Sequence, residues 1–400
     1  MKIVKGGVTA PKGFLAGSTS CGIKKSGKTD LALLFSEAPC VAIGTFTTNK
    51  VKSGSVVLCM ERLKKGTSQG VIVNSGNANC CSGKKETKNA VEITKVLAAK
   101  LGVKKDLILM ASTGIIGRPL PTDKIKNGLN SLMDDLSASN GTNFAKAIMT
   151  TDTVHKEIAV QINIKGKAVK IAGACKGAGM IRPDMATMLA FFTTDAVVEK
   201  NAVAKAFRES IYDSFNKITV DGDMSTNDSA IIFANGLAGN KAIKNNTPEY
   251  DIFLEALSFV SKELSRKIVL DGEGATRFIE IIVKGAGNEK DAELAARRIS
   301  ESSLVKTMIA GGDPNWGRIA AAVGSSGAKI DPERMDIYFG NVLVMKNGLG
   351  TNAPRDLLLA IFRKKDIEIL VDLKSGKARA RIWTCDLTKE YVRINAEYET

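Results

Sequence analysis

The sequence contains a single histidine, His155, among 400 residues. A Ser-His-Asp triad, a Cys-His pair or a multi-histidine metal site would have to use this side chain or dispense with histidine altogether. His155 lies in the segment MTTDTVHKEIAV, where we expect a strand to begin, and we interpret it as a surface or strand-end residue. Any acyl-transfer chemistry in this chain therefore needs a base other than histidine.

The sequence also has no CxxC pair, and its seven cysteines are scattered. The one adjacent pair, Cys80-Cys81, is poorly placed for a tetrahedral metal, so we expect reduced thiols and no metal site. No run reaches the roughly 18 apolar residues of a membrane span. The first residues, MKIVKGGVTAPKGF, lack the apolar core of a signal peptide. We therefore expect a cytoplasmic protein with no membrane partner.

Positive charge is in excess, with a formal net charge of +15. Such a charge is compatible with a nucleic-acid partner. The lysines, however, are spread as singles and pairs, without a basic block or basic residues interleaved with aromatic ones. We expect attraction of acidic metabolites or a solvated lysine-rich surface, and no nucleic-acid partner.

One segment imitates a nucleotide-binding motif, because Gly22 to Thr29 (GIKKSGKT) fits the phosphate-loop pattern GxxxxGK[ST]. That motif requires a hydrophobic strand before it and a helix after it. The preceding AGSTSC is small and polar, and the following DLALLF is soon interrupted by Pro39. We interpret the segment as a lysine-rich hairpin turn, with nucleotide binding as the alternative.

The stretch from Lys176 to Asp195 (KGAGMIRPDMATMLAFFTTD) organises the chain. A glycine turn and a connection through Pro183 precede the apolar run that begins at Ala186, which is typical of a buried strand. Cleavage of the Ala186–Thr187 bond would give Thr187 both a hydroxyl and a free α-amine, whose pKa of about 8 suits a base for that hydroxyl. Thr187 is therefore a candidate N-terminal nucleophile; the alternative is an ordinary β-branched strand residue.

The segment KGAGMIRPDMATML resembles the signature of the ornithine acetyltransferase family, the glutamate N-acetyltransferases of arginine biosynthesis. Further similar segments occur in order along nearly the whole chain, among them NSGNAN, STGIIG, TVDGDMSTND, DPNWGR and the terminal INAEYET. The resemblance implies that the protein cleaves itself between Ala186 and Thr187. Two departures are Met224, where the family usually has threonine, and the CCSG that follows NSGNAN.

Other site residues follow from the same resemblance. The strand DLILMAS ends at Thr113-Gly114, and a hydroxyl beside a backbone N–H is suited to stabilise an oxyanion, although a plain glycine turn would look the same. The family implies that this pair forms the oxyanion hole. It also implies substrate contacts at Thr150, Lys176, Thr187, Glu273, Asn395 and Thr400. The terminal carboxylate would suit a cationic ornithine side chain.

The length is compatible with two domains or one large α/β domain. The resemblance implies an α/β (α+β) fold, a layered helix–sheet–sheet–helix sandwich of the self-processing ornithine acetyltransferase/DmpA-like type. We place the larger domain at 1–280 and a smaller C-terminal α/β domain, whose tail returns to the active site, at 281–400. Processing would give chains 1–186 and 187–400, and the family implies a heterotetramer of two of each.

Periodicity predicts several helices and strands outside the motifs. Residues 268–270 and 391–400 have the pattern of strands, the latter with a frayed tail. The predicted helices are 84–101, 123–136, 143–149, 203–215, 254–264 and 291–303.

The expected function is transfer of acetyl from N2-acetyl-L-ornithine to L-glutamate through an acetyl-Thr187 intermediate. No cofactor is expected, and whether acetyl-CoA serves as a further acetyl donor stays open. One alternative is a self-processing aminopeptidase or amidase of related fold, in which water is the acceptor. The other is a basic nucleotide- or nucleic-acid-binding protein.

Overall fold

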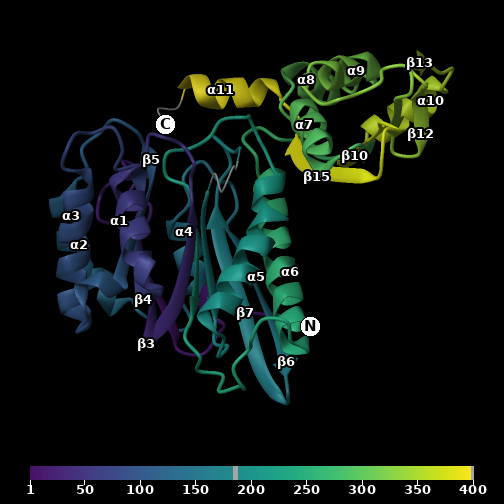
Figure 1. Ribbon diagram of the computed structural model, residues 1–400. Helices are drawn as coiled ribbons and strands as arrows, with labels where there is room; N and C mark the ends of the chain where they lie inside the picture. Colours follow the sequence, from purple (N-terminus) through teal and green to yellow (C-terminus); the bar gives the residue numbers. More distant parts are fainter. Residues whose placement is uncertain (183–187, 398–400) are drawn as a thin grey trace. The chain divides into compact units, whose positions relative to one another are not determined.

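The computed structural model describes residues 1–182 and 188–397 and divides into two compact units (Figure 1). Among the described residues, unit 1 consists of Met1–Asn216 and Asp223–Ile268, and unit 2 consists of Lys217–Gly222 and residues 269–397. The division falls near the end of a long helix. None of the helices in these ranges combines the length and apolar character needed to cross a membrane.

Unit 1 alternates strands and helices. Its strands are β1 (Lys2–Val4), β2 (Phe14–Thr19), β3 (Leu31–Phe46), β4 (Thr67–Asn77), β5 (Ile108–Ile115), β6 (Lys156–Ile164), β7 (Lys167–Lys176), β8 (Leu189–Thr194) and β9 (Ser229–Ala234). Its helices are α1 (Gly54–Arg62), α2 (Glu86–Leu101), α3 (Thr122–Asp134), α4 (Gly141–Ala147), α5 (Lys200–Tyr212) and α6 (Pro248–Leu270), which extends two residues past the division. Short 3-10 turns are η1 (Gly7–Thr9), η2 (Leu63–Lys65), η3 (Lys105–Leu107) and η4 (Phe215–Lys217).

The described strands of unit 1 form one sheet in the order β1-β6-β7-β8-β9-β3-β4-β5, with β2 also paired to β3. The long strand β3 belongs to both halves of this sheet and joins them. Its first half pairs with β2, its second half pairs with β9, and a register irregularity lies between Phe35 and Cys40. Such an irregularity bends a strand. The two halves of the sheet can therefore face each other across a common core.

Alternation along the strands shows the resulting layers. Leu34 and Phe191 point into the core between the two halves, where Phe144 of α4 meets Phe191 edge-on at 5.5 Å. Their neighbours point outward, as the two-residue period of a strand requires. Leu33 contacts the cluster under α1, α2 and α3, and Phe192 packs on Phe207 of α5.

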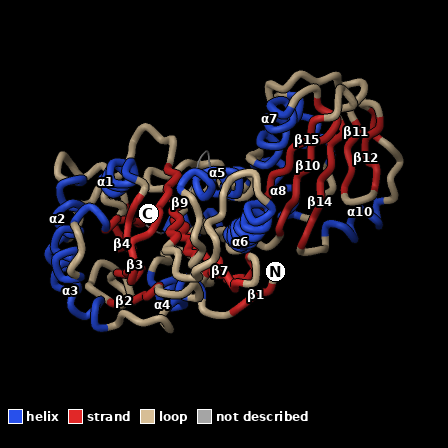
Figure 2. The backbone as a smooth tube through the Cα atoms, turned by 60° about the horizontal axis from the view of Figure 1, so that its bottom comes forward, coloured by secondary structure: helices blue, strands red, loops and turns tan. Residues whose placement is uncertain are grey.

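Figure 2 shows the same arrangement, with α1, α2 and α3 on one side of the strands of unit 1 and α5 and α6 on the other. The predicted helix–sheet–sheet–helix sandwich is thus confirmed, with the qualification that both sheet layers belong to one continuous sheet.

The strands on either side of residue 187 are interleaved. Strand β8 pairs antiparallel with β7 and parallel with β9, and β9 pairs antiparallel with β3. Two strands from the later part of the chain therefore lie between strands from the earlier part. A cut at Ala186–Thr187 would leave both products in one sheet.

Unit 2 contains a second sheet. In its described part the strand order is β13-β12-β11-β14-β10-β15, with β10 and β14 parallel and the other neighbours antiparallel. One buried cluster joins this sheet to α7, α8, α9 and α10. The strands are β10 (Phe278–Ala286), β11 (Asp336–Phe339), β12 (Val342–Lys346), β13 (Leu349–Gly350), β14 (Asp366–Asp372) and β15 (Ala378–Cys385). The helices are α7 (Glu289–Ser300), α8 (Ser303–Gly311), α9 (Trp316–Gly324), α10 (Arg355–Phe362) and α11 (Lys389–Glu397).

The predicted helices are confirmed, with ends that differ by a few residues, but two strand predictions are wrong. Residues 268–270 are the last turn of α6, because Leu257, Leu264 and Ile268 continue one buried helical face. Residues 389–397 form α11, whose Arg393 pairs with Glu390 and Glu397 at helical spacing. The alternation of apolar residues in VRINA imitated a strand.

Candidate active site

The ends of β5 and β7 bring two predicted site residues together. Parallel pairing of β4 and β5 places Thr113 beside Ser75 and Gly114 beside Gly76. Lys176 ends β7, and its Nζ lies 3.4 Å from the Thr113 hydroxyl although 63 residues separate the two in sequence. Lys176 is buried, whereas most lysines are solvated at the surface.

The position of Gly114 permits only glycine. Its φ is 129°, a region that residues with a Cβ rarely adopt. A Cβ atom there would lie 2.3 Å from the carbonyl carbon of Gly76 and 2.5 Å from the nitrogen of Asn77. The close approach of the two backbones therefore explains the Thr-Gly dipeptide at this strand end, and it accounts for glycine independently of any catalytic role.

A buried carboxylate, Asp152, connects the surrounding segments. It accepts hydrogen bonds from the backbone N–H of Thr150 (3.0 Å), the Nζ of Lys156 (2.7 Å) and the backbone N–H of Gly177 (2.7 Å). Burial raises the pKa of Asp152, but the cations of Lys176 and Lys156 and the bond from Gly177 more than offset this and hold it well below its usual range. Asp152 thus fixes Thr150 relative to the start of the segment that follows Lys176.

Asp152 and Lys156 were not among the predicted site residues. The sequence does contain a signal, the Asp-x-x-x-Lys spacing immediately after the two threonines. Both side chains are fully buried, and the pairing satisfies two charges that would otherwise be costly to bury.

The loop before β3 reaches the same region through Lys24. Its Nζ donates to the carbonyl oxygens of Met149 (2.8 Å) and Thr29 (2.9 Å). Burial lowers the pKa of Lys24 to about 8; the nearby carboxylate of Asp30 raises it and the cation of Lys176 lowers it further. A second cation therefore lies close to Lys176.

The same loop is a hairpin turn, as predicted. It joins the antiparallel strands β2 and β3, with Thr19 opposite Leu31. The backbone N–H groups of Ile23 and Lys24 donate to the carboxylate of Asp30, at 2.6 and 2.9 Å. The phosphate-loop alternative is wrong, because no helix follows and these donors are already used within the chain.

In unit 2, Glu273 and Asn395 are brought together. The Nδ2 of Asn395 on α11 donates to Oε2 of Glu273 at 2.8 Å, although 122 residues separate them. Glu273 is buried, whereas a carboxylate in an acidic turn is usually solvated. This contact joins two of the predicted substrate residues within one unit.

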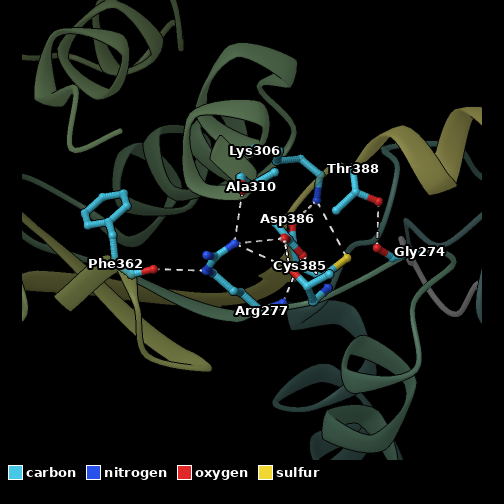
Figure 3. Close-up of polar contacts among 9 residues, drawn as sticks. Gly274, Arg277, Lys306, Ala310, Phe362, Cys385, Asp386 and Thr388 are labelled. Atoms are coloured by element: carbon cyan, nitrogen blue, oxygen red, sulfur yellow. Dashed lines mark hydrogen bonds and ion pairs between the residues drawn. The ribbon is translucent and has the colours of Figure 1, made fainter. Parts of the chain in front are cut away.

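The loop that carries Glu273 is held by the segment between β15 and α11 (Figure 3). Asp386 accepts from the backbone N–H groups of Thr276 (2.8 Å) and Arg277 (3.0 Å), and the Thr388 hydroxyl donates to the carbonyl of Gly274 (2.7 Å). Arg277 in turn donates to the carbonyl oxygens of Phe362 and Ala310, at 3.0 and 3.2 Å. The loop therefore has a fixed backbone position within unit 2.

Three predicted residues, Ala186, Thr187 and Thr400, lie outside the described residues. His155 is 39% exposed and lies 3.9 Å from Glu157, so the prediction of a surface residue is confirmed. Met224 accepts a hydrogen bond from the Thr48 hydroxyl through its sulfur, at 3.5 Å.

Over the described ranges, no group of three or more histidine, cysteine or acidic side chains is arranged to hold a metal ion. All seven cysteines lie in those ranges and are free thiols.

The model of the ArgJ family matches residues 15–400 of this chain. The chain belongs to the ArgJ family. It is 48% identical over 404 residues to the arginine biosynthesis bifunctional protein ArgJ of Caldanaerobacter subterraneus subsp. tengcongensis, with 100% of both chains covered. It is 45% identical over 412 residues to the glutamate N-acetyltransferase of Methanocaldococcus jannaschii, again with 100% of both covered. The family predicted from KGAGMIRPDMATML is thereby confirmed.

Solved structures agree with this assignment. The crystal structure of the arginine biosynthesis bifunctional protein argJ from Bacillus halodurans is 41% identical, with a TM-score of 0.51. The match covers 53% of this ArgJ-family chain and 100% of that chain. The described fold is therefore one already known in the family.

Proposed function

We propose that this protein is a glutamate N-acetyltransferase of arginine biosynthesis, which transfers the acetyl group of N2-acetyl-L-ornithine to L-glutamate. The observation that carries the proposal is full-length similarity to ArgJ-family relatives at 41–48% identity that bear this activity or pathway in their names. The contact between Thr113 and Lys176 at the end of β5 supports it, since this is where the oxyanion site is proposed.

The first step is self-processing. Thr187 Oγ attacks the carbonyl carbon of Ala186, the peptide becomes an ester by an N→O shift, and water hydrolyses that ester. The products are chain 1–186 and chain 187–400, the second of which begins with a free threonine amine. This amine can serve as the base in place of a histidine, because the only histidine lies exposed on the surface.

The second step forms the acetyl-enzyme. Thr187 Oγ attacks the acetyl carbonyl of N-acetylornithine while the α-amine of Thr187 takes the hydroxyl proton. The Thr113 hydroxyl and the Gly114 N–H donate to the oxyanion, each worth about 3 kcal/mol in comparable sites. The tetrahedral intermediate collapses, and ornithine leaves with the proton on its amine.

The cations near this strand end are suited to the substrate. Lys176 is buried and lies beside Thr113, and we propose that its cation attracts a substrate carboxylate. Asp152 fixes Thr150 and the backbone of Gly177, so both the Thr150 contact and the start of the segment leading to Thr187 are preorganised. Glu273, Asn395 and Thr400 are proposed to bind the amino-acid substrate.

The third step completes a double displacement. The amine of glutamate attacks the acetyl-Thr187 ester, N-acetylglutamate leaves, and Thr187 is restored. No resident cofactor is required by this scheme. Acetyl-CoA, as a second donor, would form the same acetyl-enzyme, and the word bifunctional in the relatives' names makes it the first further donor to test.

Assembly and location are part of the proposal. The interleaved order of β7, β8, β9 and β3 supports cleavage products that stay together. We place two copies of each chain in a heterotetramer, in the cytoplasm.

The decisive experiment compares the intact masses of wild type and Thr187→Ala. Two fragments in the wild type, the second starting at Thr187, with one uncut chain in the variant, are expected. A wild type that stays at 400 residues after long incubation would contradict the mechanism.

Incubation with acetyl-labelled N-acetylornithine then tests the transfer. We expect the label on the fragment that begins at Thr187, its discharge by glutamate, and parallel double-reciprocal lines. Equal acetate release with and without glutamate would instead favour the amidase alternative, in which water is the acceptor.

A further inference from the structure

The turn after β4 carries two adjacent cysteines that the proposed mechanism does not use. The Sγ atoms of Cys80 and Cys81 lie 3.8 Å apart. Cys81 has a left-handed φ of 55°, a conformation typical of residues in turns. Cys80 is buried and Cys81 is exposed, so the pair has one thiol that a reagent can reach and a second directly behind it.

The distance between the sulfurs fits a bridging atom better than a disulfide. Thiolates are soft ligands, and a soft three-coordinate atom can bind two sulfurs that lie close together without a bond between them. A disulfide usually requires Cα atoms about 4.4 Å apart or more, whereas successive Cα atoms across a trans peptide are about 3.8 Å apart. The geometry therefore favours chelation of a thiophilic atom over direct S–S bonding.

The turn is hydrogen-bonded to the strand end that carries the proposed oxyanion site. The carbonyl of Cys80 accepts from the N–H of Gly117 at 2.8 Å. The N–H of Ala78 donates to the carbonyl of Ile115 at 3.0 Å. These bonds lie one and three residues beyond Gly114, so they connect the turn to the strand end that carries Thr113 and Gly114.

We propose that Cys80 and Cys81 form a dithiol site for trivalent arsenicals, and that occupation of this site slows acetyl transfer through the end of β5. The coupling to transfer rests on the proposed function, whereas the binding itself does not.

The reaction balances without an external oxidant or reductant. An organoarsenoxide condenses with both thiols, so that two As–S bonds form while the As=O bond and two S–H bonds break. Both protons leave with the oxygen as water, and arsenic stays trivalent. Burial raises the pKa of the Cys80 thiol to about 11, opposed by its contact with Thr226, so Cys81 reacts first and Cys80 closes the ring.

Phenylarsine oxide is the probe, used on the purified full-length protein under non-denaturing conditions. The variants are Cys81→Ser, Cys80→Ser and, as the matched single-thiol control, Cys21→Ser, which alters a half-buried thiol away from the turn. We expect wild type and Cys21→Ser to gain one phenylarsenic group per Cys80-containing chain by intact mass. A dithiol should remove it, and an equal excess of monothiol should not.

Both turn variants should bind at least tenfold more weakly. Adducts as stable in Cys80→Ser and Cys81→Ser as in wild type would overturn the site. Cys81 is exposed, so a normal melting temperature and normal basal transfer in Cys81→Ser show that a lost adduct is not misfolding.

The coupling is tested by ornithine release at graded occupancy. We expect the rate of ornithine release by wild type to fall in proportion to the arsenical bound. The rate of Cys81→Ser should change little at the same arsenical concentration. Full occupancy with an unchanged rate would overturn the coupling. A protein that binds the arsenical but shows no acetyl transfer at all would instead contradict the proposed function, so the two failures are distinguishable.

Discussion

At the scale of single residues, Gly114 is the most constrained position of the proposed site. In Gly114→Ala both the positive φ and the 2.3 Å approach to Gly76 must be relieved by moving a strand end. We expect a loss of more than about 1–3 kcal/mol in unfolding free energy, the range for backbone strain alone, together with loss of transfer activity. Urea unfolding and an ornithine-release assay measure the two effects.

Gly117→Ala is the matched control for this prediction. Gly117 also has a positive φ, 84°, but an added Cβ would meet no atom within 4 Å. Gly117→Ala should therefore lower the unfolding free energy less than Gly114→Ala does, because it adds backbone strain without a clash. Equal losses in the two variants would show that crowding against Gly76 is not what selects glycine at Gly114.

The hydroxyl of Thr113 is predicted to act on the rate rather than on stability. Removal of one oxyanion donor lowers kcat by about 10²–10³-fold in comparable enzymes. We expect that loss in Thr113→Ala, with most of the rate restored in Thr113→Ser. A Thr113→Ala enzyme with wild-type kcat would exclude the hydroxyl from the oxyanion site.

The depressed pKa of Asp152 predicts that the stability of the protein depends on pH. Its pKa is depressed in the folded protein, so its stabilisation is fully present above the unfolded value of about 3.9 and is lost as the pH falls through that value toward the lower folded one. Asp152→Asn leaves Lys156 buried without its counter-charge, which costs about 3–5 kcal/mol in comparable buried pairs.

Urea unfolding between pH 3 and pH 7 measures the difference in unfolding free energy between wild type and Asp152→Asn. This difference should shrink below about pH 4. Asp106→Asn, which breaks the solvated pair with Lys65, is the control and should change stability little. A wild-type-minus-variant difference that stays constant across the range would contradict the charge-based account.

At the scale of elements, the loop from 271 to 277 depends on the segment after β15 for its position. Thr388→Val removes the hydrogen bond to the carbonyl of Gly274 without changing the size of the side chain much. One such bond is worth about 0.5–1.5 kcal/mol, so we expect KM for glutamate to rise by up to roughly tenfold with kcat nearly retained. Steady-state kinetics with glutamate as the varied substrate measure this.

Thr351→Val is the matched control in the same unit. The Thr351 hydroxyl makes the same kind of bond, to the carbonyl of Leu343 at 2.7 Å, but on a different loop. It should leave KM unchanged. A comparable rise in both variants would indicate a general loss of stability in unit 2 rather than a displaced Glu273.

Elements with a clear period were predictable from the sequence, and those without one were not. The hairpin of β6 and β7 turns at Lys165-Gly166, both with positive φ, and the glycine there suits such a turn. The helix α11 was missed because it buries no side chain and is supported by its charged pairs. A helix without a buried face has no apolar pattern of helical period, so the pattern of apolar residues does not predict it.

The candidate site was predictable only where a motif marked it. Thr113, Gly114 and Lys176 were found through resemblance to a family, and their proximity then followed from the sheet. The pair of Asp152 and Lys156 was missed because the Asp-x-x-x-Lys spacing in a polar stretch does not indicate that both side chains will be fully buried. Burial is set by the fold around them.

At the scale of the whole molecule, the interleaved sheet predicts how the two proposed chains behave. Fragment 187–400 made alone would expose both sides of the β8–β9 pair, and fragment 1–186 would lack two central strands. We expect the separately produced halves to be insoluble and inactive, whereas the naturally cut protein should co-elute as one species in size exclusion. Active enzyme reconstituted simply by mixing folded halves would contradict this.

The order of strands also has a consequence in time. During synthesis β3 and β7 are complete long before the last strand between them, β9, ends at Ala234. Until then the growing chain has two open strand edges, and the proposed cleavage point has already been made. A cut at that stage would release a fragment that could not finish its sheet. We therefore expect the proposed cleavage to follow folding. A new amino terminus at Thr187 would then be found only in molecules whose sheet is complete.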